Sequence, residues 1–192
     1  MQSILALDHS LFLFIYHLPH TVLLDAVALT LSGIGAGGLI WLALSILIFV
    51  RVERREHWFF LPIVLALGVS YTAAELFLKN LIMRPRPPMA TLTDFSFPSS
   101  HATIAWALAV VLATKEPRLK YFYYTLAILI CLSRIYLGVH YPSDVVAGSI
   151  LGLAIGWFSL RVERLVIQYR HAQIKRKRTS HYTRGRRSRK SH

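Results

Sequence analysis

Two histidines, several cations and one carboxylate gather in three short polar segments between long apolar stretches. The segments are Lys79–Pro87, Phe97–Ala102 and Ser133–Asp144. One histidine can attack phosphorus as a nucleophile, and a second can protonate the leaving oxygen. Arginine suits phosphate because its planar fork binds two oxygens at once. These residue types therefore predict chemistry on a phosphate group.

The third segment pairs a histidine with a carboxylate. Asp144 follows His140 by four residues, which is about one helical turn. If Pro142 begins a helix, Asp144 can accept a hydrogen bond from the His140 ring. That bond would fix the tautomer of the ring and direct its free nitrogen at phosphorus. His140 is thus a candidate nucleophile, and His101 in the second segment is a candidate general acid.

An anion site is expected around these histidines. Ser99 and Ser100 stand at a helix start, where free backbone N–H groups and the helix dipole attract anions. Lys79, Arg86 and Arg134 border apolar stretches, where charges are costly and indicate function. Once these roles are filled, no cluster of carboxylates or histidines is left to bind a metal. The sequence therefore predicts a metal-independent mechanism with no cofactor.

The three segments resemble the three-part signature of the type-2 phosphatidic acid phosphatase superfamily, also called lipid phosphate phosphatases. Its pattern is Lys-x6-Arg-Pro, then Pro-Ser-Gly-His, then Ser-Arg-x5-His-x3-Asp. The matching residues are Lys79, Arg86 and Pro87, then Pro98, Ser99 and His101, then Ser133, Arg134, His140 and Asp144. Ser100 departs from the pattern, because it stands where the family has glycine. Serine is small and can cap a helix, so we expect activity to be kept.

The resemblance implies a role for each matching side chain. It implies phosphate binding by Lys79, Arg86, Ser99, the backbone of Ser100 and Arg134. It further implies that His101 is the general acid, that His140 is the nucleophile and that Asp144 orients His140.

Apolar helices are expected to position these segments. The chain has 192 residues, is 55% hydrophobic and carries a formal net charge of +13. Its apolar residues form long blocks with the charges between them, as a bilayer requires of spanning helices. Four blocks are expected to cross: Trp58–Leu78, Ala102–Thr114, Tyr121–Gly138 and Val145–Leu160. With one crossing from the N-terminal region, the prediction is an all-α transmembrane helix bundle of about five crossings.

The N-terminal region allows two interpretations. In the first, residues 8–31 form helices at or near the membrane interface, and a crossing helix covers about Gly37–Val50. In the second, one continuous crossing runs from Thr21 to Val50. The glycine-rich stretch at 33–38 is compatible with either.

Charge gives the expected orientation. Loops 51–57 and 115–120 and the segment after Leu160 are basic, so the positive-inside rule places them in the cytoplasm. The three polar segments then lie together on the extracytoplasmic face of a cell membrane. We expect one multi-pass membrane domain over residues 1–165 and a basic, disordered cytoplasmic tail over residues 166–192. The tail should touch anionic lipid, and no nucleic-acid partner is expected because no folded binding motif accompanies it.

Four further features are weighed against plainer explanations. Arg84 lies outside the signature and either contacts lipid head groups or takes part in the site. Glu75 should pair with Lys79 one turn along the helix, and Asp94 should be a solvated loop residue. Glycines recur every four residues at 148, 152 and 156, which predicts close helix packing.

The predicted function is hydrolysis of a phosphate monoester or diphosphate ester of a lipid through a phosphohistidine. By resemblance to small bacterial members of the family, undecaprenyl diphosphate is the first candidate substrate. Phosphatidylglycerophosphate, phosphatidic acid and lipid A phosphate are alternatives. A transporter of anions or lipid phosphates and a catalytically dead scaffold are the non-enzyme alternatives. The sequence leaves the oligomeric state open.

Overall fold

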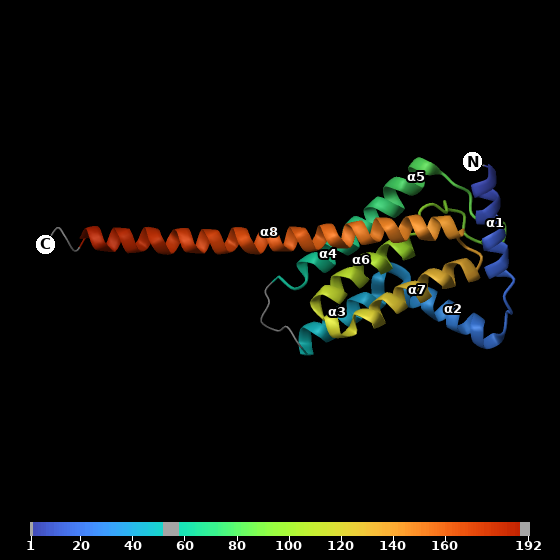
Figure 1. The fold of residues 1–192 in the computed structure, drawn as a ribbon, viewed down its shortest axis with the longest axis horizontal. Helices are drawn as coiled ribbons and strands as arrows, with labels where there is room; N and C mark the ends of the chain where they lie inside the picture. Colours follow the sequence, from blue (N-terminus) through green and yellow to red (C-terminus); the bar gives the residue numbers. More distant parts are fainter. Residues whose placement is uncertain (1, 52–57, 189–192) are drawn as a thin grey trace.

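The structure, a computed structural model, describes residues 2–51 and 58–188. These ranges contain helices and no strand (Figure 1), which confirms the all-α prediction. In chain order the elements are α1 (Gln2–Tyr16), α2 (Val22–Gly35), the 3-10 turn η1 (Ala36–Gly38), α3 (Leu39–Arg51), α4 (Leu61–Tyr71), the π-helical segment η2 (Thr72–Leu78), α5 (Lys79–Ile82), α6 (Ser100–Lys115), the 3-10 turn η3 (Pro117–Leu119), α7 (Lys120–Tyr136) and α8 (Pro142–Ser188).

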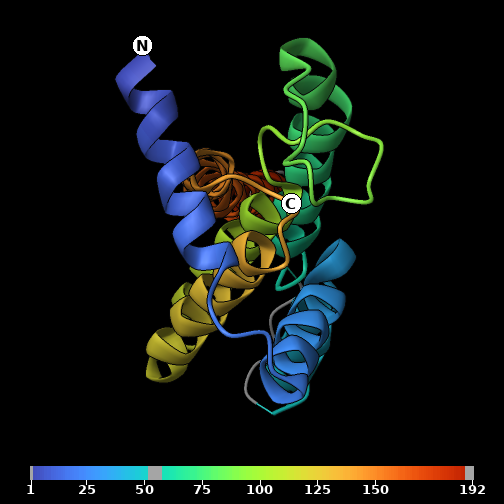
Figure 2. The same ribbon diagram turned by 90° about the vertical axis from the view of Figure 1, so that its right-hand side faces the viewer.

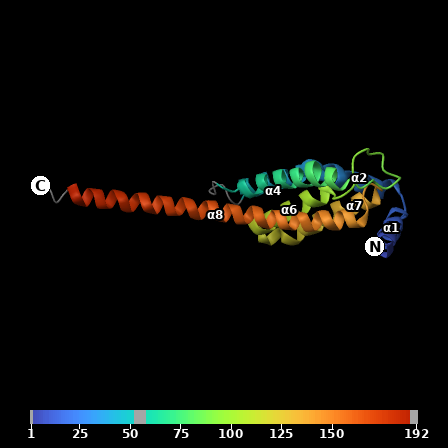
Figure 3. The ribbon, with the colours of Figure 1, turned by 90° about the horizontal axis from the view of Figure 1, so that it is seen from above.

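The two ends of the bundle carry different connections. The connections from α5 to α6 and from α7 to α8 lie at the end crossed by α1, whereas the chain leaves the bundle through α8 at the opposite end (Figures 1 and 3). Figure 2 looks onto the α1 end, where α1 and the α5–α6 connection lie on opposite sides. The three polar segments therefore meet at one end, as the alternation of crossings predicts.

The N-terminal region combines parts of both interpretations. α1 lies across the end of the bundle (Figures 1 and 3), whereas α2, η1 and α3 form one apolar helical run over Val22–Arg51. This run has nearly the extent of the continuous alternative, and the interfacial position of residues 8–31 stays a prediction. The run bends at Gly37 and Gly38, whose φ angles of 57° and 76° suit glycine because it lacks a Cβ atom.

Helix α6 forms the centre of the bundle. Most of its residues, twelve of sixteen, are buried, including Thr103 and Leu108. It packs most closely on α8, where glycines remove the side chains that would separate the backbones. A Cβ atom on Gly148 would lie 2.5 Å from the carbonyl oxygen of Ser99, and one on Gly156 would lie 2.6 Å from that of Ala107. The predicted packing role of these glycines is confirmed.

The outer surface of the bundle is apolar. Within residues 2–51 and 58–188, three helical stretches are long and apolar enough to cross a membrane: Val22–Arg51, Leu61–Ile82 and Pro142–Gln173. Large apolar side chains are exposed on all three, for example Leu81 at 70% and Trp157 at 76%. An exposed apolar surface of this kind fits lipid contact. The number of crossings, for which α6 and α7 are the shorter candidates, stays a prediction.

Helix α8 continues far beyond the predicted last crossing. It begins at Pro142, as expected, and the helix runs to Ser188 and projects from the bundle (Figure 1). This differs from the disorder predicted for residues 166–188, and the rest of the predicted tail, residues 189–192, lies outside the described residues. Lys, Arg and Gln are good helix formers, and extending an existing helix avoids the cost of nucleation. The cytoplasmic location of this segment stays a prediction.

Candidate active site

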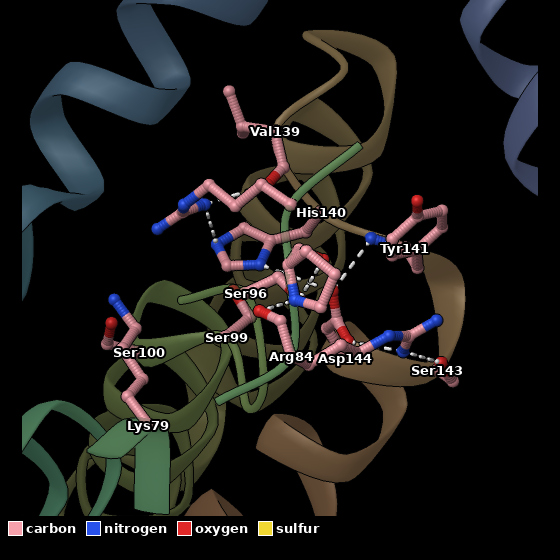
Figure 4. Close-up of polar contacts among 12 residues, drawn as sticks. Lys79, Arg84, Ser96, Ser99, Ser100, Val139, His140, Tyr141, Ser143 and Asp144 are labelled. Atoms are coloured by element: carbon pink, nitrogen blue, oxygen red, sulfur yellow. Dashed lines mark hydrogen bonds and ion pairs between the residues drawn. The ribbon is translucent and has the colours of Figure 1, made fainter. Parts of the chain in front are cut away.

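The histidine–carboxylate pair lies at the start of α8, with His140 two residues before the helix and Asp144 in its first turn. His140 and Asp144 are 1% and 0% exposed, and the Nδ1 atom of His140 lies 3.6 Å from Oδ2 of Asp144 (Figure 4). That separation is longer than a normal hydrogen bond, so the ring is aligned with the carboxylate without a tight contact. The backbone N–H of Tyr141 donates to the same Oδ2 atom at 2.9 Å. Asp144 thus stands one turn from His140 because Pro142 begins the helix between them.

The other ring nitrogen of His140 faces a cation. Arg86 Nη1 lies 3.2 Å from His140 Nε2 and donates to the carbonyl oxygen of Val139 at 2.7 Å. Burial, together with nearby Arg86 and Arg134, lowers the pKa of His140 to about 4 against the opposing effect of Asp144. The ring is therefore neutral near pH 7. With Nδ1–H directed at Asp144, Nε2 carries the lone pair on the side of Arg86.

Two of the three cations of the first segment, Lys79 and Arg86, share one carboxylate. Lys79, which is 4% exposed, donates to Asp94 Oδ2 at 2.6 Å and to Glu75 Oε1 at 2.9 Å. Arg86 donates to both oxygens of Asp94 at 2.8 Å. The predicted pair of Glu75 and Lys79 is confirmed. Asp94 is 43% exposed, as expected of a solvated loop residue. The prediction did not include its ion pairs with Lys79 and Arg86.

The second segment lies against the third. The backbone N–H of Ser99 donates to the carbonyl oxygen of Asp144 at 3.0 Å, and the Ser99 hydroxyl is buried without a hydrogen-bond partner in the described part of the chain. The Ser100 hydroxyl donates to Glu75 Oε2 at 2.5 Å. The serine that replaces the family's glycine is thus accommodated by a carboxylate of η2. Its side chain turns to Glu75, and its backbone begins α6.

Helix α2 also reaches this region. Arg134 Nη1 donates to the hydroxyl of Ser32, and Arg134 Nε is buried without a partner among the described residues. The backbone of Ser32 also forms a hydrogen bond with His101. Buried polar atoms normally find partners, so the unused Arg134 Nε and the unused Ser99 hydroxyl fit a site for an anion. None of the hydrogen bonds between described residues joins His101 to His140, so their opposed arrangement stays a prediction.

Comparison with a family profile identifies the protein family of this chain. The profile described as the PAP2 superfamily matches residues 59–167, which includes all three polar segments. The chain belongs to the PAP2 superfamily. The resemblance found in the sequence is therefore confirmed.

Individual PAP2 proteins are similar over much of their length. An undecaprenyl-diphosphatase of Sulfolobus acidocaldarius is 32% identical over 136 residues, which cover 65% of this chain and 64% of that protein. A decaprenylphosphoryl-5-phosphoribose phosphatase of Mycobacterium tuberculosis is 37% identical over 143 residues, which cover 68% of this chain and 76% of that protein. The chain thus spans just under two thirds of the Sulfolobus protein.

A solved PAP2 structure has the same fold. The crystal structure of a transmembrane PAP2 type phosphatidylglycerolphosphate phosphatase from Bacillus subtilis superposes with a TM-score of 0.69 at 26% identity. The superposition covers 86% of this chain and 89% of that one. Together with the apolar helices, this likeness shows that the chain is a membrane protein.

Several residues around the PAP2 signature were not assigned from the sequence. Arg84 contacts Asp144, Ser143 and Asp8, rather than only lipid head groups. Ser32 was not singled out, since a serine within an apolar helix gives no signal of its partner. Among the described residues, no group of three or more His, Cys, Asp or Glu side chains is arranged to hold a metal ion. Metal independence stays a prediction.

Proposed function

We propose that this PAP2 protein is a metal-independent lipid phosphatase that forms a phosphohistidine at His140. The observation that carries the proposal is the placement of the His140 ring between two charged groups. Its Nδ1 faces Asp144 at 3.6 Å, and its Nε2 faces Arg86 at 3.2 Å. An anion transporter or channel needs cations, but it does not need a neutral histidine aligned in this way. The non-enzyme alternatives therefore have less support.

The first step transfers the phosphoryl group to the protein. The lone pair on His140 Nε2 attacks phosphorus, and the P–N bond forms as the bond from phosphorus to the leaving oxygen breaks. The leaving oxygen takes a proton from His101. Lys79, Arg86 and Arg134, with the Ser99 hydroxyl and the Ser100 N–H, stabilise the charge on the three equatorial oxygens. Asp144 stabilises the charge that develops on the His140 ring.

The second step releases phosphate. His101 takes a proton from water, and the water oxygen attacks the phosphorus of the phosphohistidine. The P–N bond then breaks, and its electrons return to His140 Nε2. The products are inorganic phosphate and either a lipid alcohol, from a monoester, or a lipid monophosphate, from a diphosphate.

Undecaprenyl diphosphate is the first candidate substrate. Two similar proteins are named for polyprenyl phosphate substrates, which supports this class. Phosphatidylglycerophosphate, phosphatidic acid and lipid A phosphate remain alternatives. The basic residues of loops 51–57 and 115–120 support a cytoplasmic location for these loops. In this proposal the site faces outward in the cell membrane, and the C-terminus is cytoplasmic.

The proposal is tested by phosphate release from the purified protein in detergent with EDTA. The panel contains undecaprenyl diphosphate, undecaprenyl phosphate, phosphatidylglycerophosphate and phosphatidic acid, each with wild type and His140→Ala. We expect release by wild type and loss in the variant. Equal release by both proteins would exclude His140 as the nucleophile. No release from any lipid, together with phosphate flux into liposomes that survives His140→Ala, would favour a transporter.

A further inference from the structure

Arg84 lies against the carboxylate that faces the candidate nucleophile. Its Nη1 atom donates to Asp144 Oδ1 and to the Ser143 hydroxyl, both at 2.6 Å, and Figure 4 shows the three side chains together. Its guanidinium carbon also lies 4.3 Å from the centre of the Tyr141 ring. Arg84 is therefore held by the first turn of α8 and by the residue that precedes it. It stands two residues before Arg86 but turns to a different set of partners.

Asp8 on α1 completes this contact from the other side. Its Oδ2 accepts from Arg84 Nη2 at 2.7 Å and from the Ser143 hydroxyl at 2.6 Å. Its Oδ1 accepts from the backbone N–H of Ser143 at 2.8 Å. Asp8 is 6% exposed although it lies on a mainly apolar N-terminal helix. A carboxylate buried there is costly unless it is paired, which indicates a specific role.

The charges of Asp8, Arg84 and Asp144 explain why two carboxylates are present. Arg84 paired with Asp144 alone would cancel the negative charge that has to stabilise the His140 ring. Asp8 supplies a second negative charge, so Asp8, Arg84 and Asp144 together carry one net negative charge. Burial opposes ionisation of Asp8, but hydrogen bonds from Arg84 and Ser143 outweigh it and hold the pKa of Asp8 below its usual value. Asp8 is therefore ionised near pH 7.

The same contacts fix the orientation of the Asp144 carboxylate. Arg84 holds Oδ1 at 2.6 Å, and the backbone N–H of Tyr141 holds Oδ2 at 2.9 Å. With both oxygens bonded, the carboxylate plane cannot rotate freely. Oδ2 is thereby kept on the side of His140 Nδ1. A change in Arg84 or Asp8 would reach the reaction through Asp144, because neither side chain has a hydrogen bond to His140 among the contacts of the described residues.

We propose that Asp8 and Arg84 are positioning residues that orient Asp144 and preserve its negative charge toward His140. This inference rests on the proposed phosphatase function. It gives α1 a role in catalysis, although α1 lies outside the region matched by the PAP2 profile.

The test compares Asp8→Asn with wild type in phosphate release from undecaprenyl diphosphate. Asparagine has nearly the same shape and keeps one accepting oxygen, so the variant removes the charge and one of the two hydrogen-bond acceptors. We expect kcat to fall about 10- to 100-fold with KM nearly unchanged, as when hydrogen-bond partners of a reactive group are removed. In an Asp144→Asn background, Asp8→Asn should have little further effect, because its action passes through Asp144.

The matched control is Glu163→Gln at the opposite end of the bundle. Glu163 is also 6% exposed and forms an ion pair with Lys115 at 2.7 Å. Loss of this pair should lower thermal stability but leave kcat unchanged. If Asp8→Asn does not fold, Arg84→Lys is measured instead, because lysine keeps the charge but cannot form the same set of bonds.

The outcomes separate this inference from the proposed function. Release that is absent in wild type would contradict the phosphatase itself. Release by wild type, with kcat unchanged in Asp8→Asn or in Arg84→Lys, would overturn only the positioning role. Equal loss from Asp8→Asn in the wild-type and Asp144→Asn backgrounds would also overturn it, since the effect would then bypass Asp144.

Discussion

Asp94 and Arg86 form a two-point ion pair in which Arg86 Nε and Nη2 donate to the two carboxylate oxygens at 2.8 Å. Lys79 donates to the same carboxylate at 2.6 Å. Asp94 therefore occupies the donors of the two residues that the PAP2 signature assigns to phosphate. Burial opposes ionisation, but hydrogen bonds from Arg86 and Lys79 outweigh it and hold the pKa of Asp94 below its usual value. The carboxylate is thus a charged competitor for the same site.

Replacing Asp94 by asparagine should strengthen phosphate binding. An incoming phosphate has to displace the carboxylate, and asparagine removes the charge that competes with it. We expect the inhibition constant of inorganic phosphate to fall about two- to fivefold. This change matches the small free-energy contribution of a partly exposed ion pair. The measurement is inhibition of lipid phosphate hydrolysis by inorganic phosphate.

Asp25→Asn is the matched control, because its carboxylate is 39% exposed and bonds to His20 and Tyr136. Its inhibition constant should equal that of wild type. An unchanged or higher constant in Asp94→Asn would show that Asp94 supports the phosphate site instead of competing for it.

His140 should be neutral well below the usual pH range of histidine. Burial lowers its pKa to about 4, so the ring is neutral above about pH 4 and gains a proton as the pH falls through that value. The nucleophile is then fully available at pH 6. The measurement is a titration of histidine ring ¹⁵N shifts in detergent, in which the signal missing from His140→Gln identifies His140. A midpoint near 6.5 would contradict the burial and cation effects described above.

Gly148→Ala should disturb the contact between α6 and α8. The added Cβ atom would lie 2.5 Å from the carbonyl oxygen of Ser99, which is backbone and cannot simply rotate away. We expect a loss of about 1–3 kcal/mol in the free energy of unfolding and lower phosphatase activity, since the Ser99 N–H is bonded to Asp144.

Gly68→Ala in α4 is the control, because no atom apart from the neighbouring residues and backbone of its own helix lies within 4 Å of its added Cβ. There the helix preference of alanine should leave stability equal or slightly higher. Denaturant unfolding of both variants checks the comparison, and equal stabilities would contradict the close packing at Gly148.

The sequence predicted the parts of the site that depend on local spacing. Pro142 begins α8, and His140 and Asp144 therefore meet across one turn. The alternation of apolar blocks brought the three polar segments to one end because each helix reverses the direction of the chain. Glu75 and Lys79 paired for the same local reason.

The sequence could not predict contacts between distant segments. The bond from Arg84 to Asp8 joins residues 76 positions apart, and no local pattern indicates which of several acids an arginine will meet. The pairing of Asp94 depends on how the α5–α6 connection folds back over Lys79. The contact of Ser32 with Arg134 depends on the packing of α2, whose extent the sequence left open.

Restoring the family's glycine at Ser100 should cost stability more than activity. The Ser100 hydroxyl donates to Glu75 Oε2, and Glu75 also accepts from Lys79. Ser100→Gly removes one bond to a charged group, which is worth about 1.5–3 kcal/mol, and adds a flexible residue at the start of α6. The backbone N–H assigned to phosphate stays in place, so kcat should change less than about threefold.

Ser100→Ala separates the loss of the hydrogen bond from the flexibility of glycine, because it removes the hydroxyl but keeps the Cβ atom. Its loss of stability should be smaller than that of Ser100→Gly by the cost of glycine in a helix, about 1 kcal/mol. Thermal unfolding and kcat of both variants provide the measurement. A rise in kcat of tenfold or more in Ser100→Gly would instead show that the serine side chain holds the backbone away from phosphate.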